Sequence, residues 1–115
     1  MSIDSAKAAA AGFLSLVDER EYDKSYSEAS AVLRDEVSQE DWGAHLRDLR
    51  DPLGKLHKRS QSSSEYHESL PDAPPGEYVI FTFDSAYENN QHAAEVVAVA
   101  KGSDGVWRVI GYYFG

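Results

Sequence analysis

The hydrophobic pattern of this chain changes its period near Gly54, and no other feature constrains the fold as strongly. Before this point, apolar residues recur at the i, i+3, i+4, i+7 spacing of amphipathic helices, and after it apolar and polar residues alternate as in strands. Helices first and strands second are typical of the α+β class. For 115 residues we expect one α+β domain at 1–115, with helices at about 4–53 and strands at about 55–114.

Three short helices are predicted in the first half. Asp4 can cap the first, Ser25 with Glu28 can cap the second, and Ser38 caps a third that ends at 52–54. Each helix has one apolar stripe that we expect to face the core. These stripes are Ala10, Phe13, Leu14 and Val17, then Tyr22, Tyr26, Ala29 and Leu33, then Trp42, Leu46, Leu49 and Leu53.

Four antiparallel strands in meander order are predicted after Gly54. Residues 55–68 are polar and rich in serine, which favours an edge strand. A loop with three prolines follows at 70–76, because proline cannot donate to a strand ladder. Strands at 78–87, 93–101 and 106–114 complete the sheet, joined by turns at 89–90 and 102–105. The sequence therefore predicts three helices packed on a four-stranded antiparallel sheet.

Two of these strands carry bulky residues on both faces. Ile80 alternates with Phe81, and the last strand is expected to place Ile110 and Tyr112 opposite Val109. One face must meet the helices, and a large apolar face left exposed usually marks an interface. We therefore expect a protein partner or a homodimer. If a homodimer forms, introducing a charged residue at Ile80, Ile110 or Tyr112, whichever points outward, should give a monomer. The alternative is that the polar edge strand and the proline loop cover the second face.

Composition and charge narrow the classes of partner. The formal net charge of -9 argues against nucleic acid and anionic membranes as partners. There is no cysteine, and no apolar run is long enough to cross a membrane. The first ten residues lack the basic and apolar regions of a signal peptide, so a cytoplasmic location and a trimmed export signal both stay open.

Motifs for metal, phosphate or nucleophilic chemistry are not found in the sequence. His57 and His67 share a side of the predicted edge strand, but their ten-residue separation spans about 33 Å, beyond the reach of one metal. No Gly-x-Ser-x-Gly pattern occurs, and the eight glycines are dispersed. We expect no metal, no cofactor and no catalytic residue.

Several segments together resemble one bacterial family. They are 13–18 with Tyr22, Ser25 and Trp42, then 50–54 with Arg59, the loop 70–78, Glu95, and the closing strand 107–112. The resemblance is to the bacterial domain of unknown function 4019 family and covers nearly the whole chain. Asp72 and Pro75 depart from it, because glycine and a polar residue are expected there. The resemblance implies a cystatin-like or NTF2-like fold and members that are often exported, and it implies no activity.

Glu95 carries the main alternative in this sequence. It shares a strand face with Val97 and Val99, so its carboxylate is expected among apolar groups. A buried carboxylate of this kind is a candidate general base. The other interpretation is an ion pair with Arg50 or Arg59, the arginines that the family motif offers, which would hold geometry without catalysis.

Three functions follow from these alternatives. The first is a non-enzymatic module that binds protein or associates with itself. The second is an NTF2-like enzyme or small-molecule binder with a cavity near Glu95, Tyr78 and Tyr112. Against this function, we expect no pocket above roughly 300 Å³ between sheet and helices, because the aromatic side chains are needed to fill the core. The third is an acidic inhibitor or immunity-type protein, since nine acids lie at 18–41. A cystatin-like inhibitor is weakened by the absence of a Gln-x-Val-x-Gly loop.

Overall fold

The computed structural model describes residues 3–71 and 73–115, and it has the predicted α+β order of helices followed by strands. The helices are α1 (Asp4–Asp18), α2 (Tyr22–Ser27), α3 (Ala31–Glu36) and α4 (Gln39–Arg50), followed by the short 3-10 helix η1 (Asp51–Leu53). The strands are β1 (Leu56–His67), β2 (Tyr78–Tyr87), β3 (Asn90–Lys101) and β4 (Trp107–Phe114). They form one antiparallel sheet in the order β1-β2-β3-β4, which confirms the predicted meander.

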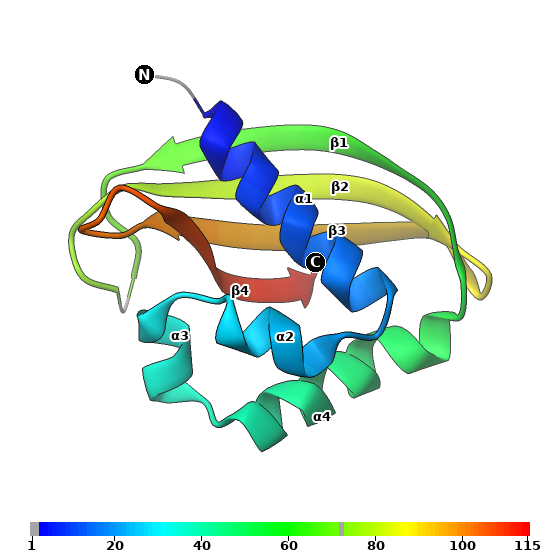
Figure 1. The fold of residues 1–115 in the computed structure, drawn as a ribbon. Helices are drawn as coiled ribbons and strands as arrows, with labels where there is room; N and C mark the ends of the chain where they lie inside the picture. Colours follow the sequence, from blue (N-terminus) through cyan, green and yellow to red (C-terminus); the bar gives the residue numbers. More distant parts are fainter. Residues whose placement is uncertain (1–2, 72) are drawn as a thin grey trace.

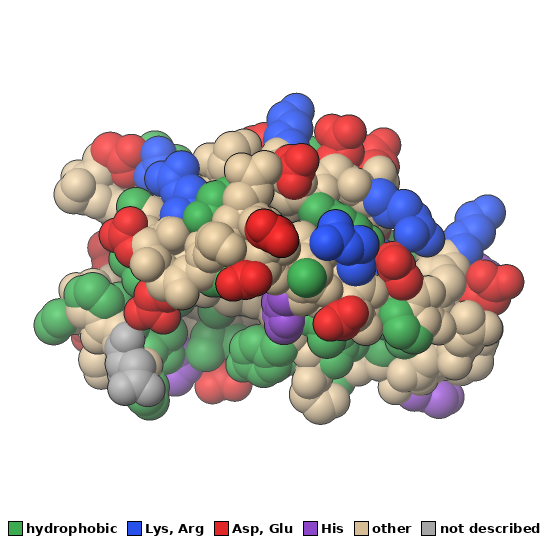
Figure 2. Space-filling view, turned by 90° about the horizontal axis from the view of Figure 1, so that it is seen from below, with side chains coloured by type: hydrophobic (Ala, Val, Ile, Leu, Met, Phe, Trp, Pro, Cys, Tyr) green, Lys and Arg blue, Asp and Glu red, His purple; other side chains and the backbone are tan. Residues whose placement is uncertain are grey.

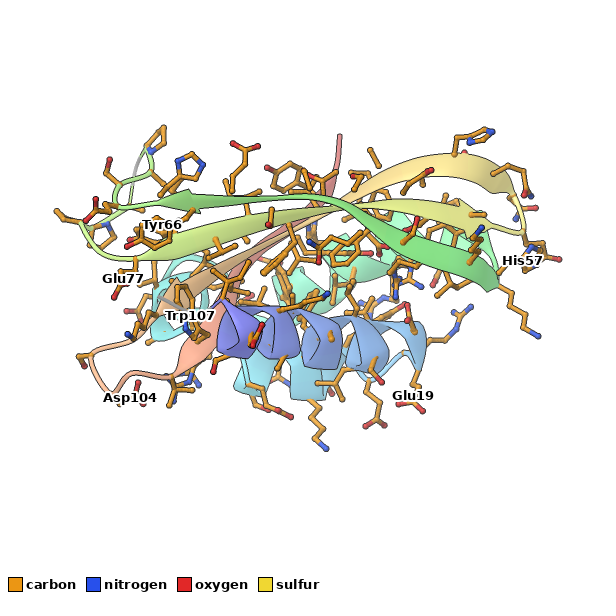
Figure 3. The ribbon with its side chains drawn as sticks, turned by 90° about the horizontal axis from the view of Figure 1, so that it is seen from above. Glu19, His57, Tyr66, Glu77, Asp104 and Trp107 are labelled. Atoms are coloured by element: carbon orange, nitrogen blue, oxygen red, sulfur yellow. The ribbon has the colours of Figure 1, made fainter. Side chains whose placement is uncertain are left out.

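All four helices lie on the same side of the sheet (Figures 1 and 3). Helix α1 crosses the inner face, and α2 to α4 lie beside β4 (Figure 1). Phe13 of α1 joins the layers, because its ring contacts Tyr112 of β4 at 5.2 Å and Trp42 of α4 at 6.2 Å between centroids. The core therefore lies between the helices and the inner face of the sheet, and α3 and α4 contribute Leu33, Trp42 and Leu46 to it. Within the described ranges, no helix has the length and apolar character needed to cross a membrane.

The described residues form four α-helices, so the prediction of three is wrong. The single helix expected from near Ser25 is divided into α2 and α3. Ser30 lies between them in extended conformation, where its N–H donates to Val109 O of β4 at 2.8 Å and its hydroxyl caps α3 through Val32 N. These bonds to the sheet edge and to the next helix replace the helical bonds that continuation would have formed.

The predicted helix caps are confirmed in one case of three. Ser38 caps α4, accepting from Asp41 N at 3.1 Å, as predicted. Ile3, not Asp4, occupies the cap position of α1. Ser25 is not a cap either: it is buried inside α2, where its hydroxyl donates to Tyr22 O and accepts from the Trp42 indole.

A β-bulge in β4 shows that the prediction of Ile110 and Tyr112 on one face of that strand is wrong. Gly111 faces Ala98 and Val109 faces Val99, so Ile110 is an extra residue in the register. The bulge changes the alternation, and Tyr112 consequently points into the core with 2% of its surface exposed. Tyr112 and Ile110 therefore do not share an outward face.

The outer face of the sheet carries smaller and more mixed side chains than expected. Ile80, Thr82 and Asp84 of β2 lie on it opposite Ala98, Val96 and Ala94 of β3, and Tyr113 of β4 is its exposed aromatic residue, with 47% of its surface accessible. The proline loop covers only one end of this face, where the Tyr78 hydroxyl bonds Pro74 O. Asp72, one of the two departures from the family pattern, lies outside the described residues.

Candidate functional site

Charged and hydroxyl side chains from six elements meet where the ends of α1 and α4 approach the sheet. We refer to them as the Glu95 cluster: Asp18 of α1, Arg50 of α4, Arg59 of β1, Ser85 and Tyr87 of β2, Glu95 of β3 and Tyr112 of β4. Every strand and the two longest helices contribute to it. The cluster therefore ties together segments from both halves of the chain.

Local structure explains why these side chains converge. In β2, Ser85 and Tyr87 continue the inward alternation of Phe83, which faces Glu95 across the β2–β3 ladder. Arg59 faces Ser85 from β1. Asp18 is the last residue of α1 and directly follows the buried Val17. Arg50 is the last residue of α4 and lies one helical turn after the buried Leu46. Each polar group thus extends a stripe that is otherwise apolar.

Glu95 is fully buried, and both of its carboxylate oxygens accept hydrogen bonds. Oε1 accepts from Arg59 Nε at 2.8 Å and from Ser85 Oγ at 2.8 Å. Oε2 accepts from Tyr87 Oη at 2.8 Å, from Arg59 Nη2 at 3.2 Å and from the Tyr112 hydroxyl. A carboxylate offers about four lone-pair positions, so this one has none left for a substrate proton.

The predicted ion pair of Glu95 is therefore confirmed, and Arg59 is its main partner. The two form a salt bridge at 2.8 Å, whereas Arg50 Nη1 lies 3.9 Å from Oε2. Arg50 instead donates from Nη2 to Asp18 Oδ1 at 2.8 Å. Its guanidinium also stacks over the Tyr87 ring, 4.9 Å from the centroid, and its buried Nε has no hydrogen-bond partner among the described residues.

Asp18 is the second carboxylate of the cluster and connects both arginines. Its Oδ2 accepts from Arg59 Nη1 at 2.8 Å, and its Oδ1 accepts from Arg59 Nη2 at 2.9 Å as well as from Arg50. The two guanidinium groups are thus matched by two carboxylates, Asp18 and Glu95. Such balance lowers the electrostatic penalty of burying charges, which is severe for an unpaired ion.

The protonation of the cluster follows from burial and from these neighbours. Burial raises the pKa of the Asp18 carboxyl, but the hydrogen bonds and charges of Arg59 and Arg50 outweigh it, and the pKa lies below the ordinary value of 3.8. Burial and then the negative charge of Glu95 raise the pKa of Tyr87 from 10.0 to about 12. The same two causes raise the pKa of Tyr112. Both phenols accordingly keep their protons as donors to Glu95 at neutral pH.

The raised pKa of Tyr87 predicts a loss of stability at alkaline pH. In the unfolded chain this phenol loses its proton near pH 10, but in the folded chain it does so near 12. The stabilisation that Tyr87 contributes is therefore complete below about pH 10 and is lost as the pH rises toward 12. Urea unfolding measured at several pH values across this window should show a falling free energy of unfolding. Tyr87→Phe should flatten this dependence, and an unchanged slope in that variant would contradict the assignment.

An open hollow of about 510 Å³ lies at the rim of the molecule, where α1 ends and β1 begins. Asp18 and Arg50 reach it from the cluster, but Glu95 does not. A second hollow, of about 370 Å³, lies between α3, α4 and Ile110. The expected ceiling of roughly 300 Å³ is therefore wrong. Aromatic residues fill the core as predicted, but the larger hollow lies at its rim, between the end of α1 and the start of β1.

The remaining candidate residues lie away from the cluster. Tyr78, predicted to line a cavity with Tyr112, faces outward on β2 and is covered by the proline loop. His57 and His67 lie near opposite ends of β1, and Figure 3 shows His57 at the far end of the sheet from Tyr66. Across residues 3–71 and 73–115, no three His, Cys, Asp or Glu side chains are grouped closely enough to hold a metal ion.

Sequence reasoning missed three members of the cluster. Ser85 and Tyr87 could have been found, because they alternate in phase with Phe81 and Phe83. Asp18 is part of segment 13–18 of the family resemblance and one of the nine acids at 18–41, and neither pattern predicts its contact with the two arginines. Its position directly after the buried Val17 is a weak signal, since many helices end in exposed acids.

Comparisons with known proteins give one match. No curated protein and no solved structure matches this chain. The model of the family described as "Protein of unknown function (DUF4019)" matches residues 9–112. This range begins within α1, ends at Tyr112 and includes every member of the Glu95 cluster. The chain therefore belongs to the DUF4019 family.

Proposed function

We propose that this domain acts by contact with protein, as a small non-enzymatic binding module. Its working surface is the part of the sheet that the helices leave uncovered: the outer face and the free edge of β1. The observation that carries the proposal is the one-sided placement of the helices (Figure 3). Antiparallel sheets commonly leave one face to solvent, and apolar side chains on such a face mark candidate contact sites. Here that face carries Ile80 and the half-exposed Tyr113.

The Glu95 cluster supports a structural role for the interior. A general base must reach the proton that it removes, and it needs a free lone pair to do so. Glu95 has neither a solvent path nor an unoccupied acceptor position. The arrangement also supports the finer proposal of a cystatin-like or NTF2-like fold, in which helices pack on one face of an antiparallel sheet.

The helical side offers a less selective surface. The acids at 18–41 are largely exposed, but Figure 2 shows basic side chains interspersed among them. Mixed charges of this kind produce a weaker field than a patch of one sign. For this reason we place the binding surface on the sheet and not on an acidic helical face.

Photo-crosslinking tests this proposal directly. A photoreactive amino acid is placed at Tyr113 or at Ser63, which lie on the outer face in β4 and β1, and at Asp35 of α3 as the matched exposed control. The chain is irradiated alone and in extract of its source cells. We expect protein adducts from the two sheet positions, not from Asp35, and excess unlabelled chain should compete them away.

The competition step has its own control. An excess of Tyr113→Glu should compete poorly for the adduct formed at position 113, because it places a charge on the binding face. Adducts confined to Asp35, or none at either sheet position, would contradict the proposal.

A second candidate function rests on the hollow at the rim. Its volume of about 510 Å³ falls in the range of small-molecule sites. Asp18, Arg50 and Tyr22 line it with charged and polar groups, so its ligand would be a small polar molecule. In that case the Glu95 cluster would hold Asp18 and Arg50 in position at the hollow.

A further inference from the structure

The two edges of the sheet are protected to very different degrees. On β4, the carbonyl groups of Val109 and Tyr112 are occupied by Ser30 N at 2.8 Å and by the His45 ring at 3.2 Å. Helices α2 to α4 lie along that edge (Figure 1). On the other side, β1 is the outermost strand, and among the described strands it pairs with β2 alone (Figure 1). An edge of 12 residues left open in this way is a template for another strand.

The charges along β1 are sorted by sign. Lys58 lies near its beginning, Glu65 lies near its end, and serine fills most of the centre. Charged side chains, often lysine, commonly protect a free edge. On this strand, Lys58 and Glu65 carry opposite charges at equal distances from the midpoint, which lies between Gln61 and Ser62.

Two copies of this strand are complementary when they run antiparallel. With the two-fold axis between Gln61 and Ser62, Lys58 lies opposite Glu65 of the second copy. Symmetry forms this pair twice. Opposite charges directly across an antiparallel ladder stabilise it, and like charges destabilise it. Shifting the register by two residues would separate Lys58 from Glu65, so the charges also select one register.

A β-bulge supplies the geometry that this pairing needs. Residues seven apart in a regular strand point to opposite faces, so Lys58 and Glu65 would not meet in a shared sheet. In this structure, Gln61 faces Phe83 and Ser63 faces Thr82, which makes Ser62 an extra residue. Lys58 therefore faces Ala86 and Glu65 faces Ile80, both on the outer face. The bulge places Lys58 and Glu65 on the same face of the sheet. Residues that face each other across two antiparallel strands must share a face in this way.

We propose that the β1 edges of two copies pair antiparallel about the bond between Gln61 and Ser62, joining two four-stranded sheets into one. This inference rests on the proposed binding function and names its partner, a second copy of this chain. Main-chain hydrogen bonds between the edges provide the contact, and Lys58 and Glu65 fix its direction and register. The free edge of β1 is then used, while the β4 edge stays covered by its own helices.

Charge reversal in the full chain, followed by sedimentation velocity from low to high micromolar concentration, tests this pairing. We expect a reversible dimer of the wild-type chain that weakens as salt rises. Lys58→Glu and Glu65→Lys should each weaken the dimer by at least about tenfold, because each places like charges opposite one another twice. The double variant restores both pairs and should recover the wild-type affinity. Lys24→Glu, at an exposed position of α2, should leave the dimer unchanged, and circular dichroism should show that all variants fold.

The contradicting results separate this inference from the proposed function. A wild-type chain that stays monomeric throughout, or a dimer that survives Lys58→Glu, would overturn the edge pairing. A double variant no better than the single ones would do the same. If crosslinks at Tyr113 and Ser63 then still capture protein, the binding function stands without this partner, and if they capture none, both fail.

Discussion

Replacing Glu95 by glutamine is expected to lower the free energy of unfolding by about 3–5 kcal/mol, a large part of the 5–15 kcal/mol typical of a domain. The amide keeps the shape of the side chain but removes its charge, which leaves Arg59 with Asp18 as its remaining carboxylate partner. It also turns one acceptor oxygen into a donor, and because both oxygens accept from Arg59, that donor faces a guanidinium N–H that can only donate. Thermal unfolding should occur on the order of 10–20 °C lower.

A matched control separates the buried charge from the substitution itself. Glu36→Gln makes the same chemical change at an exposed position of α3, and it should alter the free energy of unfolding by less than about 0.5 kcal/mol. Both variants are compared by urea unfolding at neutral pH. Equal stability of Glu95→Gln and the wild-type chain would show that the ion pair contributes nothing.

The architecture was predictable because period and register are properties of the sequence. The change from a 3.6-residue to a 2-residue period placed the helices before Gly54 and the strands after it. Gly54 itself marks the junction with φ +76°, where an added Cβ would meet Glu88 Oε1 at 2.5 Å. Local preferences and tertiary packing agree at these positions, so the sequence alone was sufficient.

The errors arose where tertiary contacts outweigh a local pattern. Ser30 interrupts a helical stripe because the β4 edge offers its N–H a partner, Val109 O, that lies far along the chain. The bulge at Ile110 reverses the alternation of β4, and strict alternation cannot reveal it. The hollow at the rim depends on how charged side chains are arranged around it, which a periodic pattern does not encode.

The candidate site was predictable in part, for the same reason. The place of Glu95 on an apolar strand face predicted its burial, and the family motif predicted a pairing with Arg50 or Arg59, of which Arg59 is the main partner. The hydroxyl donors Ser85 and Tyr87 were overlooked, although their alternation with Phe83 placed them on the inner face. Asp18 joins the cluster only because α1 ends beside α4, and that packing has no local signature.

Protection of Glu95 from chemical labelling is the second large effect that we expect. A water-soluble carbodiimide with glycine ethyl ester converts accessible carboxyl groups to amides, and the reagent is comparable in size to a small substrate. Glu95 has no exposed surface and is held by Arg59, Ser85 and two phenols. It can react only through opening of the fold, so labelling should be at least about 100-fold slower than at exposed carboxyl groups.

Peptide mapping of the labelled chain by mass spectrometry is the most direct test of the central claim. This claim is that the Glu95 cluster is closed and structural, and that the protein binds its partner through its surface. In the folded chain, Glu36 should be labelled rapidly, the partly exposed Asp18 more slowly and Glu95 hardly at all. In urea the three should react at similar rates. If Glu95 in the folded chain is labelled as fast as Glu36, the interior is open to small molecules, which contradicts a closed structural cluster.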